Sequence, residues 1–269
     1  MTTTPQTKYL KDYTPFPYSI NSIDLHFSLN EAYTQVKSTL VISKSTKTAG
    51  ALCLDGVGME LVSIALNDTP LHEDHYALTP DSLTIHSTPE SFTLTIETLI
   101  KPQENSSLEG LYKSNGMYCT QCEAEGFRKI TYFPDRPDVL TVYTVTLEAE
   151  KKAYPVLLAN GNLLTTGPLS GNRHYAKWED PFRKPCYLFA IVAGDLAVLN
   201  DTFTTKSNRN IQLQIYTEHH NADKCAHAMA SLKKAMLWDE TRFNLEVDLD
   251  QYMVVAVDDF NAGAMENKG

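Results

Sequence analysis

Residues 23–29 read IDLHFSL, with an apolar side chain at every second position. A strand with one buried face shows this period of two, because successive side chains point to opposite faces of a sheet. Similar alternation or short apolar runs recur at 36–42, 61–66, 92–96 and 140–147. The pattern predicts a mainly β chain over its first two hundred residues.

Turn-forming segments separate these runs: NDTP (67–70), TPDS (79–82), NGN (160–162) and SGNR (170–173). They supply Gly, Asn, Asp and Pro where the backbone must reverse. Many short strands joined by such turns, without a helical period, predict an antiparallel β-sandwich or saddle.

The pattern changes after residue 195. Asn221 is a candidate N-cap for a helix over Ala222–Trp238. The apolar stripe of that helix, at spacings of four, three and four, is Cys225, Met229, Leu232 and Met236. A further apolar strand is expected over Tyr252–Val257.

We therefore expect an N-terminal β-domain over residues 1–195 and the opening of an α/β or α+β domain over 196–269. One helix and one added strand give the second portion little apolar surface for a core of its own. The final strand also leads directly into the polar segment DDFNAGAMENKG (258–269). These features favour a piece of a longer protein.

Composition narrows the function classes. The formal net charge of −10 argues against nucleic-acid binding, which rewards Lys and Arg. The start of the chain lacks a signal-peptide pattern, and no apolar run approaches the roughly 18 residues of a membrane span. Five scattered cysteines suit a reducing compartment. A soluble, cytoplasmic protein without a membrane partner is expected.

Two motifs invite a metal or redox interpretation. HEDH (72–75) places its histidines at i and i+3, whereas a zinc helix needs H-E-x-x-H, and its neighbours are turn-like. We interpret it as a solvated loop and expect no zinc site in this chain. Cys119 and Cys122 form a C-x-x-C without a second pair. The role of these two cysteines stays open.

Residues 119–138, CTQCEAEGFRKITYFPDRPD, are rich in acids and arginines. Such a block forms a solvated or salt-bridged loop, or it holds a carboxylate and an amide to receive a cation. Glu266 has similar alternatives, as a turn or capping acid or as a ligand for a cation. The small residues Gly263 and Ala264 would let another backbone approach closely, as in strand addition by a peptide.

These two blocks together resemble the aminopeptidase N family, which are zinc metallopeptidases of the gluzincin group. GAMEN (263–267) matches the family's exopeptidase motif letter for letter. The earlier block fits its Q-x-E pattern with downstream Arg, Asp and Pro, at Gln121, Glu123, Arg128, Asp135 and Pro137. Longer strings such as CTQCEAEGFR, KPCYLFA and MENKG resemble the bacterial cytoplasmic branch. Ala262 stands where close bacterial relatives often carry Met.

The resemblance implies a role for each motif. Glu266 would bind the free α-ammonium of a peptide with help from Glu123, while Gly263 and Ala264 would offer backbone groups. The implied substrate-binding residues are Gln121, Glu123, Gly263, Ala264, Met265, Glu266 and Asn267. The zinc ligands and the thermolysin-like catalytic machinery would lie beyond residue 269, so no catalytic residue is expected here and this stretch alone would be inactive. The alternative is a non-catalytic β-sandwich module that binds peptides or partner proteins.

Overall fold

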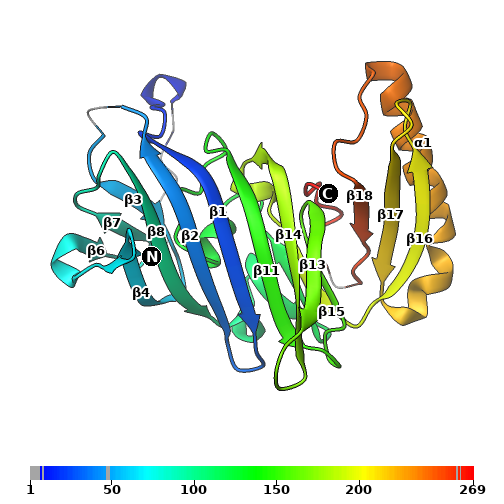
Figure 1. Cartoon of the computed structure of the whole chain (residues 1–269), viewed down its shortest axis with the longest axis horizontal. Helices are drawn as coiled ribbons and strands as arrows, with labels where there is room; N and C mark the ends of the chain where they lie inside the picture. Colours follow the sequence, from blue (N-terminus) through cyan, green and yellow to red (C-terminus); the bar gives the residue numbers. More distant parts are fainter. Residues whose placement is uncertain (1–6, 8, 47–48, 259, 261) are drawn as a thin grey trace.

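The computed structural model describes residues 7, 9–46, 49–258, 260 and 262–269. A large sheet of eight strands dominates it, in the order β13-β14-β11-β1-β2-β8-β4-β5 (Figure 1). These strands are β1 (Tyr18–Leu29), β2 (Thr34–Lys44), β4 (Glu60–Leu66), β5 (Thr69–Pro70), β8 (Ser91–Ile100), β11 (Thr141–Glu150), β13 (Asn162–Pro168) and β14 (Arg173–Lys184).

Two smaller sheets share the core of the large one. One has the order β12-β15-β10-β9 and the other β3-β7-β6. Their strands are β3 (Leu52–Asp55), β6 (Tyr76–Leu78), β7 (Ser82–Ile85), β9 (Gly110–Ser114), β10 (Met117–Gln121), β12 (Val156–Ala159) and β15 (Ile191–Gly194). Short 3-10 helices lie before and between the strands of the β-domain: η1 (Leu10–Asp12), η2 (Glu73–His75), η3 (Pro102–Glu104), η4 (Phe127–Lys129) and η5 (Cys186–Leu188).

The predicted mainly β fold is confirmed, and the apolar residues of IDLHFSL face the core as expected. Ile23, Leu25, Phe27 and Leu29 are all buried. The large sheet is not purely antiparallel, because β1 pairs with β11 in parallel. In β11 the side chains that face the core are Tyr143, Val145 and Leu147. Leu140 precedes the strand, and its side chain is exposed.

Aromatic packing connects the large sheet to the chain segments that follow β10 and precede β15, two strands of a smaller sheet. The Phe127 ring lies 5.1 Å from Phe133 and 5.1 Å from Phe189, and 6.2 Å from Tyr143 of β11, each in an edge-to-face arrangement. Such pairs add about 0.5–1.5 kcal/mol each to the burial of their apolar area. The turn after Gln121 is therefore anchored through Phe127 to the centre of the core.

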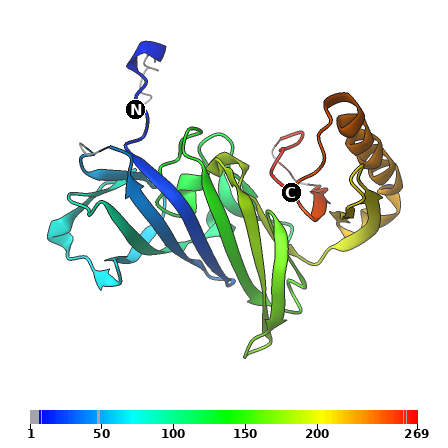
Figure 2. The same ribbon diagram turned by 45° about the horizontal axis from the view of Figure 1, so that its top comes forward.

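The remaining elements form a separate three-stranded sheet with one helix. Its strands are β16 (Ala197–Thr204), β17 (Asn210–Thr217) and β18 (Gln251–Val255), in the order β16-β17-β18. The 3-10 helix η6 (His219–Lys224) leads into α1 (Ala226–Phe243), which covers the outer side of this sheet (Figures 1 and 2). The domain boundary near residue 195 stays a prediction.

The expected helix is present, but its start was wrongly predicted. The chain passes through η6 before the α-helix begins, so Asn221 does not cap α1 and its side chain donates to Asp258 Oδ1 at 2.9 Å. The helix continues five residues past Trp238 and ends before Asn244, which adopts the left-handed conformation common after helices. The predicted stripe is confirmed, because Met229 and Met236 are buried and Leu232 packs beside them.

Strand β18 packs against two hydrophobic clusters. Tyr252 and Val254 contact the small cluster beneath α1. Met253 and Val255, together with Val257 beyond the strand, contact the main core of the β-domain. Its parallel neighbour β17 shows the same division, since Ile215 belongs to the small cluster and Tyr216 to the main core.

A buried ion pair lies within β14 and packs against Tyr143 of β11. The Lys184 Nζ lies 3.1 Å from Asp180 Oδ2 and 3.8 Å from the centre of the Tyr143 ring, and both charged side chains are at most 2% exposed. Burial lowers the pKa of Lys184 to about 8, although the Asp180 carboxylate favours the charged form.

We expect this lysine to make the unfolding free energy rise with pH. Between about pH 8 and the unfolded lysine pKa of about 10.4 the unfolded chain binds more protons than the folded one. The slope from this group reaches at most about 1.4 kcal/mol per pH unit. Denaturant unfolding at pH 7 to 10.5 should show this rise relative to the double variant Lys184→Met/Asp180→Asn. Parallel curves for the two proteins would contradict the assignment.

Residues 222–257 should exchange their amide hydrogens faster than β1, β2 and β8. The small cluster has few members, Ile211, Leu213, Ile215, Cys225, Met229 and Met236, so local opening exposes little apolar surface there. Hydrogen exchange followed by mass spectrometry measures this directly. Equal or greater protection of 222–257 would mean that this portion has a sufficient core.

Candidate functional site

The GAMEN segment, Gly263–Asn267, follows β18 and runs back toward the large sheet as an extended chain without helix or strand. In Figures 1 and 2 the C-terminus lies between the large sheet and β18. Gly263, Ala264 and Glu266 are exposed, while Met265 and Asn267 are half-buried. A Cβ added to Gly263 would meet nothing within 4 Å, so the space beside its backbone is open.

This segment forms one wall of an open hollow of about 770 Å³. The opposite wall comes from three strands of the β-domain, through Cys119 and Thr120 of β10, Leu158 and Ala159 of β12, and Ile191 and Val192 of β15. Strand β18 and the residues that follow it line most of the remainder, and Asn160 and Ala190 add to the wall of the β-domain. The hollow therefore lies where the two portions of the chain meet, and most of the strand residues lining it are apolar.

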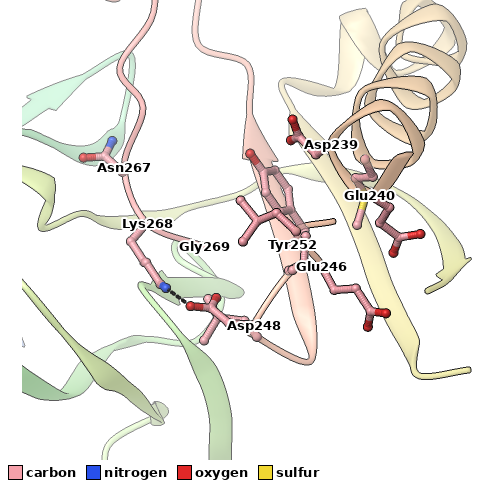
Figure 3. Close-up of a pocket in the computed structure, with 12 residues that line it drawn as sticks. Asp239, Glu240, Glu246, Asp248, Tyr252, Asn267, Lys268 and Gly269 are labelled. Atoms are coloured by element: carbon pink, nitrogen blue, oxygen red, sulfur yellow. Dashed lines mark hydrogen bonds and ion pairs between the residues drawn. The ribbon is translucent and has the colours of Figure 1, made fainter. Parts of the chain in front are cut away.

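The two residues after GAMEN border a second, smaller hollow of about 270 Å³, shown in Figure 3. Its other walls are the C-terminal end of α1, the 245–249 loop and Tyr252. Lys268 crosses this hollow, with its Nζ 2.5 Å from Asp248 Oδ2 and 4.5 Å from the centre of the Phe182 ring. Lys268 thus connects the end of the segment to both portions of the chain.

Gln121 and Glu123 lie where β10 ends. Gln121 is buried, and its Nε2 donates to the Glu123 carbonyl at 3.3 Å. The Glu123 side chain is exposed, and the Glu123–Ala124 peptide bond is cis. Gly126 closes the turn, because a Cβ there would lie 2.4 Å from the Gln121 carbonyl oxygen. The local sequence therefore presents Glu123 at the tip of a tight turn.

The charged residues that follow are structural. Arg128 donates from its backbone N and its Nε to Asp135 Oδ2, at 3.1 and 3.0 Å. Burial alone would lower the pKa of Arg128, but the hydrogen bond to Asp135 and the nearby carboxylates of Asp55 and Glu125 raise it overall. The salt-bridged interpretation of the 119–138 block thus holds around Arg128, while cation binding by the exposed Glu123 stays a prediction.

The structure brings the two motifs to one region without a direct contact between them. Cys119 and Thr120, directly before Gln121, line the same hollow as Gly263–Asn267. Within the described part of the chain, no hydrogen bond or ion pair joins Gln121 or Glu123 to that segment. The shared role of these residues therefore stays a prediction.

The cysteine pair, whose role the sequence leaves open, has the properties of core thiols. All five cysteines are free thiols, and both Cys119 and Cys122 are buried. Burial raises the pKa of Cys119 to about 11 and that of Cys122 well above its usual range. Because the thiolate is the reactive form, these are inert core thiols near neutral pH.

The HEDH motif forms an exposed turn around η2, as predicted, with the Asp74 backbone N 3.5 Å from His72 Nδ1. Across the described residues, no group of three or more His, Cys, Asp or Glu side chains is arranged to hold a metal ion. Among the same residues, no helix combines the length and apolar character needed to cross a membrane.

Sequence reasoning missed Asn160, whose buried side chain contacts the chain next to GAMEN. Its Nδ2 donates to the Lys268 carbonyl at 2.6 Å. The only sequence signal was NGN (160–162), which we interpreted as a turn. A turn signal does not reveal which distant backbone an Asn side chain will contact.

Comparison with known proteins identifies a family and several relatives that this chain is similar to. Residues 15–188 match the Peptidase M1 N-terminal domain, and residues 227–269 match the Peptidase family M1 domain. The chain is 51% identical to Aminopeptidase N of Caulobacter vibrioides and 50% identical to Aminopeptidase N of Escherichia coli K12, in each case over 100% of this chain and 31% of the relative. It therefore spans 31% of the length of these curated relatives.

A solved structure is similar in fold over the same extent. The crystal structure of Legionella pneumophila aminopeptidase A in complex with aspartic acid has a TM-score of 0.91 and 39% sequence identity. The match covers 96% of this chain and 31% of that chain. With a family domain matched over most of its length and whole-chain identities near one half, the chain belongs to the peptidase M1 family.

Proposed function

We propose that this chain is the amino-terminal part of a cytoplasmic zinc aminopeptidase and supplies the site that binds the free amino terminus of a peptide. Glu266 would bind the α-ammonium, with Glu123 as its partner and Gln121 beside it. Gly263 and Ala264 would offer backbone groups to the peptide, and Met265 and Asn267, which line the same hollow, would complete the binding site. The observation that carries the proposal is the GAMEN segment lining an open hollow next to the end of β10.

The chemistry of the two acids supports this role. Glu123 and Glu266 are both exposed, and among the described residues neither has an ion-pair partner. A peptide α-ammonium has a reference pKa of about 7.7–8.0, so it is mostly charged at pH 7. Carboxylates can therefore select it over a capped terminus through charge-assisted hydrogen bonds.

The open space beside Gly263 supports the second part of the proposal. A substrate backbone needs to approach closely to form main-chain hydrogen bonds, and a side chain at this position would stand in the approach. The names of the relatives support the same reaction class, since those proteins are aminopeptidases and one was solved with a bound amino acid.

Zinc does not fit the residues described here, since none of them forms a three-ligand group. We assign the metal to the longer protein, where it would polarise the scissile carbonyl and activate water. No step of this chain's chemistry is derived through it.

A non-catalytic module that binds peptides is the second candidate, because the same clamp could hold an amino terminus without cleaving it. An H-E-x-x-H motif in the gene downstream of GAMEN would decide for the enzyme.

Replacing Glu266 or Glu123 by Ala in the longer protein should lower kcat/KM for an amino-acid amide by about tenfold to a hundredfold, because each charge-assisted hydrogen bond contributes about 1.5–3 kcal/mol. Steady-state kinetics on one amide substrate, with zinc content and fold checked, measures this. Acetylating the substrate amine should remove most of the same advantage.

Glu125→Ala is the matched control in the same turn. Its side chain is 63% exposed and lies 3.4 Å from Arg128, and exposed pairs of this kind contribute only about 0–1 kcal/mol. Cleavage by Glu266→Ala at the parent rate, with zinc bound, would show that the amino-terminus clamp is wrong.

The 269-residue polypeptide itself should neither bind zinc tightly nor cleave peptides. The reason is the lack of a three-ligand group among the described residues, since a catalytic zinc site uses about three protein ligands. Metal analysis of chelator-washed protein and turnover of an alanyl or arginyl amide test this. Stoichiometric zinc or measurable turnover would overturn it.

A further inference from the structure

The turn Asn160–Gly161–Asn162 connects β12 to β13 and faces the second portion of the chain. The backbone of this turn contacts the large sheet closely: a Cβ on Gly161 would lie only 2.1 Å from the Glu179 carbonyl oxygen of β14. Gly161 also has a positive φ of 92°, which glycine adopts without strain. The turn therefore has a fixed position on the β-domain.

The buried Asn160 side chain uses both ends of its amide. Its Oδ1 accepts from the Ala190 N–H at 2.7 Å, and its Nδ2 donates to the Leu188 carbonyl at 3.1 Å. These two bonds orient the amide on the β-domain. The second Nδ2 hydrogen reaches the Lys268 carbonyl at 2.6 Å, one residue after GAMEN.

The other two residues of the turn hold the start of β18. The Gly161 carbonyl accepts from Gln251 Nε2 at 3.0 Å. Asn162 bonds Asp250 twice, accepting from its backbone N–H at 2.9 Å and donating to its carboxylate at 3.3 Å.

Both ends of the segment 250–268 are thus attached to one three-residue turn, and the GAMEN residues lie within that segment. Figure 1 shows the C-terminus and β18 side by side next to β13. A loop whose two ends are fixed at the same place has less freedom to move than a loop held at one end.

We infer that the Asn160–Asn162 turn is a positioning element for the amino-terminus site, holding Glu266 at a fixed place relative to the β10 turn that carries Glu123. The function of this element rests on the proposed clamp, whereas the attachment itself does not. Asn160 is a positioning residue here, since it contacts the backbone beside the site and acts through Glu266.

The positioning role depends on the two hydrogen bonds that Asn160 Nδ2 donates. Asn160→Asp keeps the shape of the side chain but turns an acceptor toward the carbonyls of Leu188 and Lys268. A packing role alone would tolerate this change, whereas the positioning role would not, since the carbonyls of Leu188 and Lys268 then lose the donor that Asn160 supplies.

The attachment is tested in the 269-residue chain by hydrogen exchange. In Asn160→Ala and Asn160→Asp, the amides of 262–269 should exchange about tenfold faster or more, while β1 and β2 stay unchanged. Asn200→Ala is the matched control, an exposed Asn whose Oδ1 accepts from Gln214 at 3.0 Å. Unchanged exchange over 262–269 in both Asn160 variants overturns the inference. If these variants do not fold, Gln251→Ala, which leaves the β-domain intact, carries the same expectation for 250–258.

Kinetics in the longer protein test the consequence. Asn160→Ala should raise KM about tenfold for an amide substrate with a free α-amine. Cleavage of a matched substrate that lacks the α-amine should stay unchanged. A merely structural defect would reduce both equally. In a Glu266→Ala background Asn160→Ala should add little, because both act through one interaction. If the losses of kcat/KM from the two substitutions add, the positioning role is wrong. If Glu266→Ala alone leaves the preference for a free amine unchanged, the amino-terminus clamp is wrong, and the attachment measured by hydrogen exchange is unaffected.

Discussion

Strand β18 is held between two hydrophobic clusters, and the position of every candidate site residue after it follows from that constraint. Tyr252 and Val254 are half-buried and pack on the small cluster beneath α1, while Met253 and Val255 pack on the main core of the β-domain. A strand with both faces occupied cannot slip by one residue without exchanging the side chains of the two cores. The segment that leaves β18 therefore starts from a fixed place and direction.

The β-domain supplies the opposite wall of the site through a different physical device. Phe127 contacts Phe133, Phe189 and Tyr143 in the main core, and Gly126 lets the backbone of the preceding turn close on Gln121. The salt bridges of Arg128 and Asp135 hold the far end of the same block. Rigid packing on one side of the turn thus leaves the Glu123 carboxylate exposed.

The β-domain and the segment that contains GAMEN are joined mainly by hydrogen bonds between neutral groups. Asn160, Gly161 and Asn162 bond the residues at both ends of the segment that contains GAMEN. Most of these bonds use amide and backbone groups, which do not titrate near neutral pH. Of the two acids proposed for the clamp, Glu266 lines the hollow together with Asp258, and Glu123 lies in the turn just after β10.

The strand-rich fold, the apolar stripe of the helix and the motifs Q-x-E and GAMEN are all predictable from the sequence, because period and residue type are local properties of the chain. Sequence reasoning failed at the helix start, where the 3-10 turn over His219–Lys224 replaced an Asn221 cap. It also missed the parallel pairing of β1 with β11 and the contact of Asn160 with Lys268. Only the tertiary structure decided these, because they depend on which distant backbone groups packing brings within hydrogen-bonding distance.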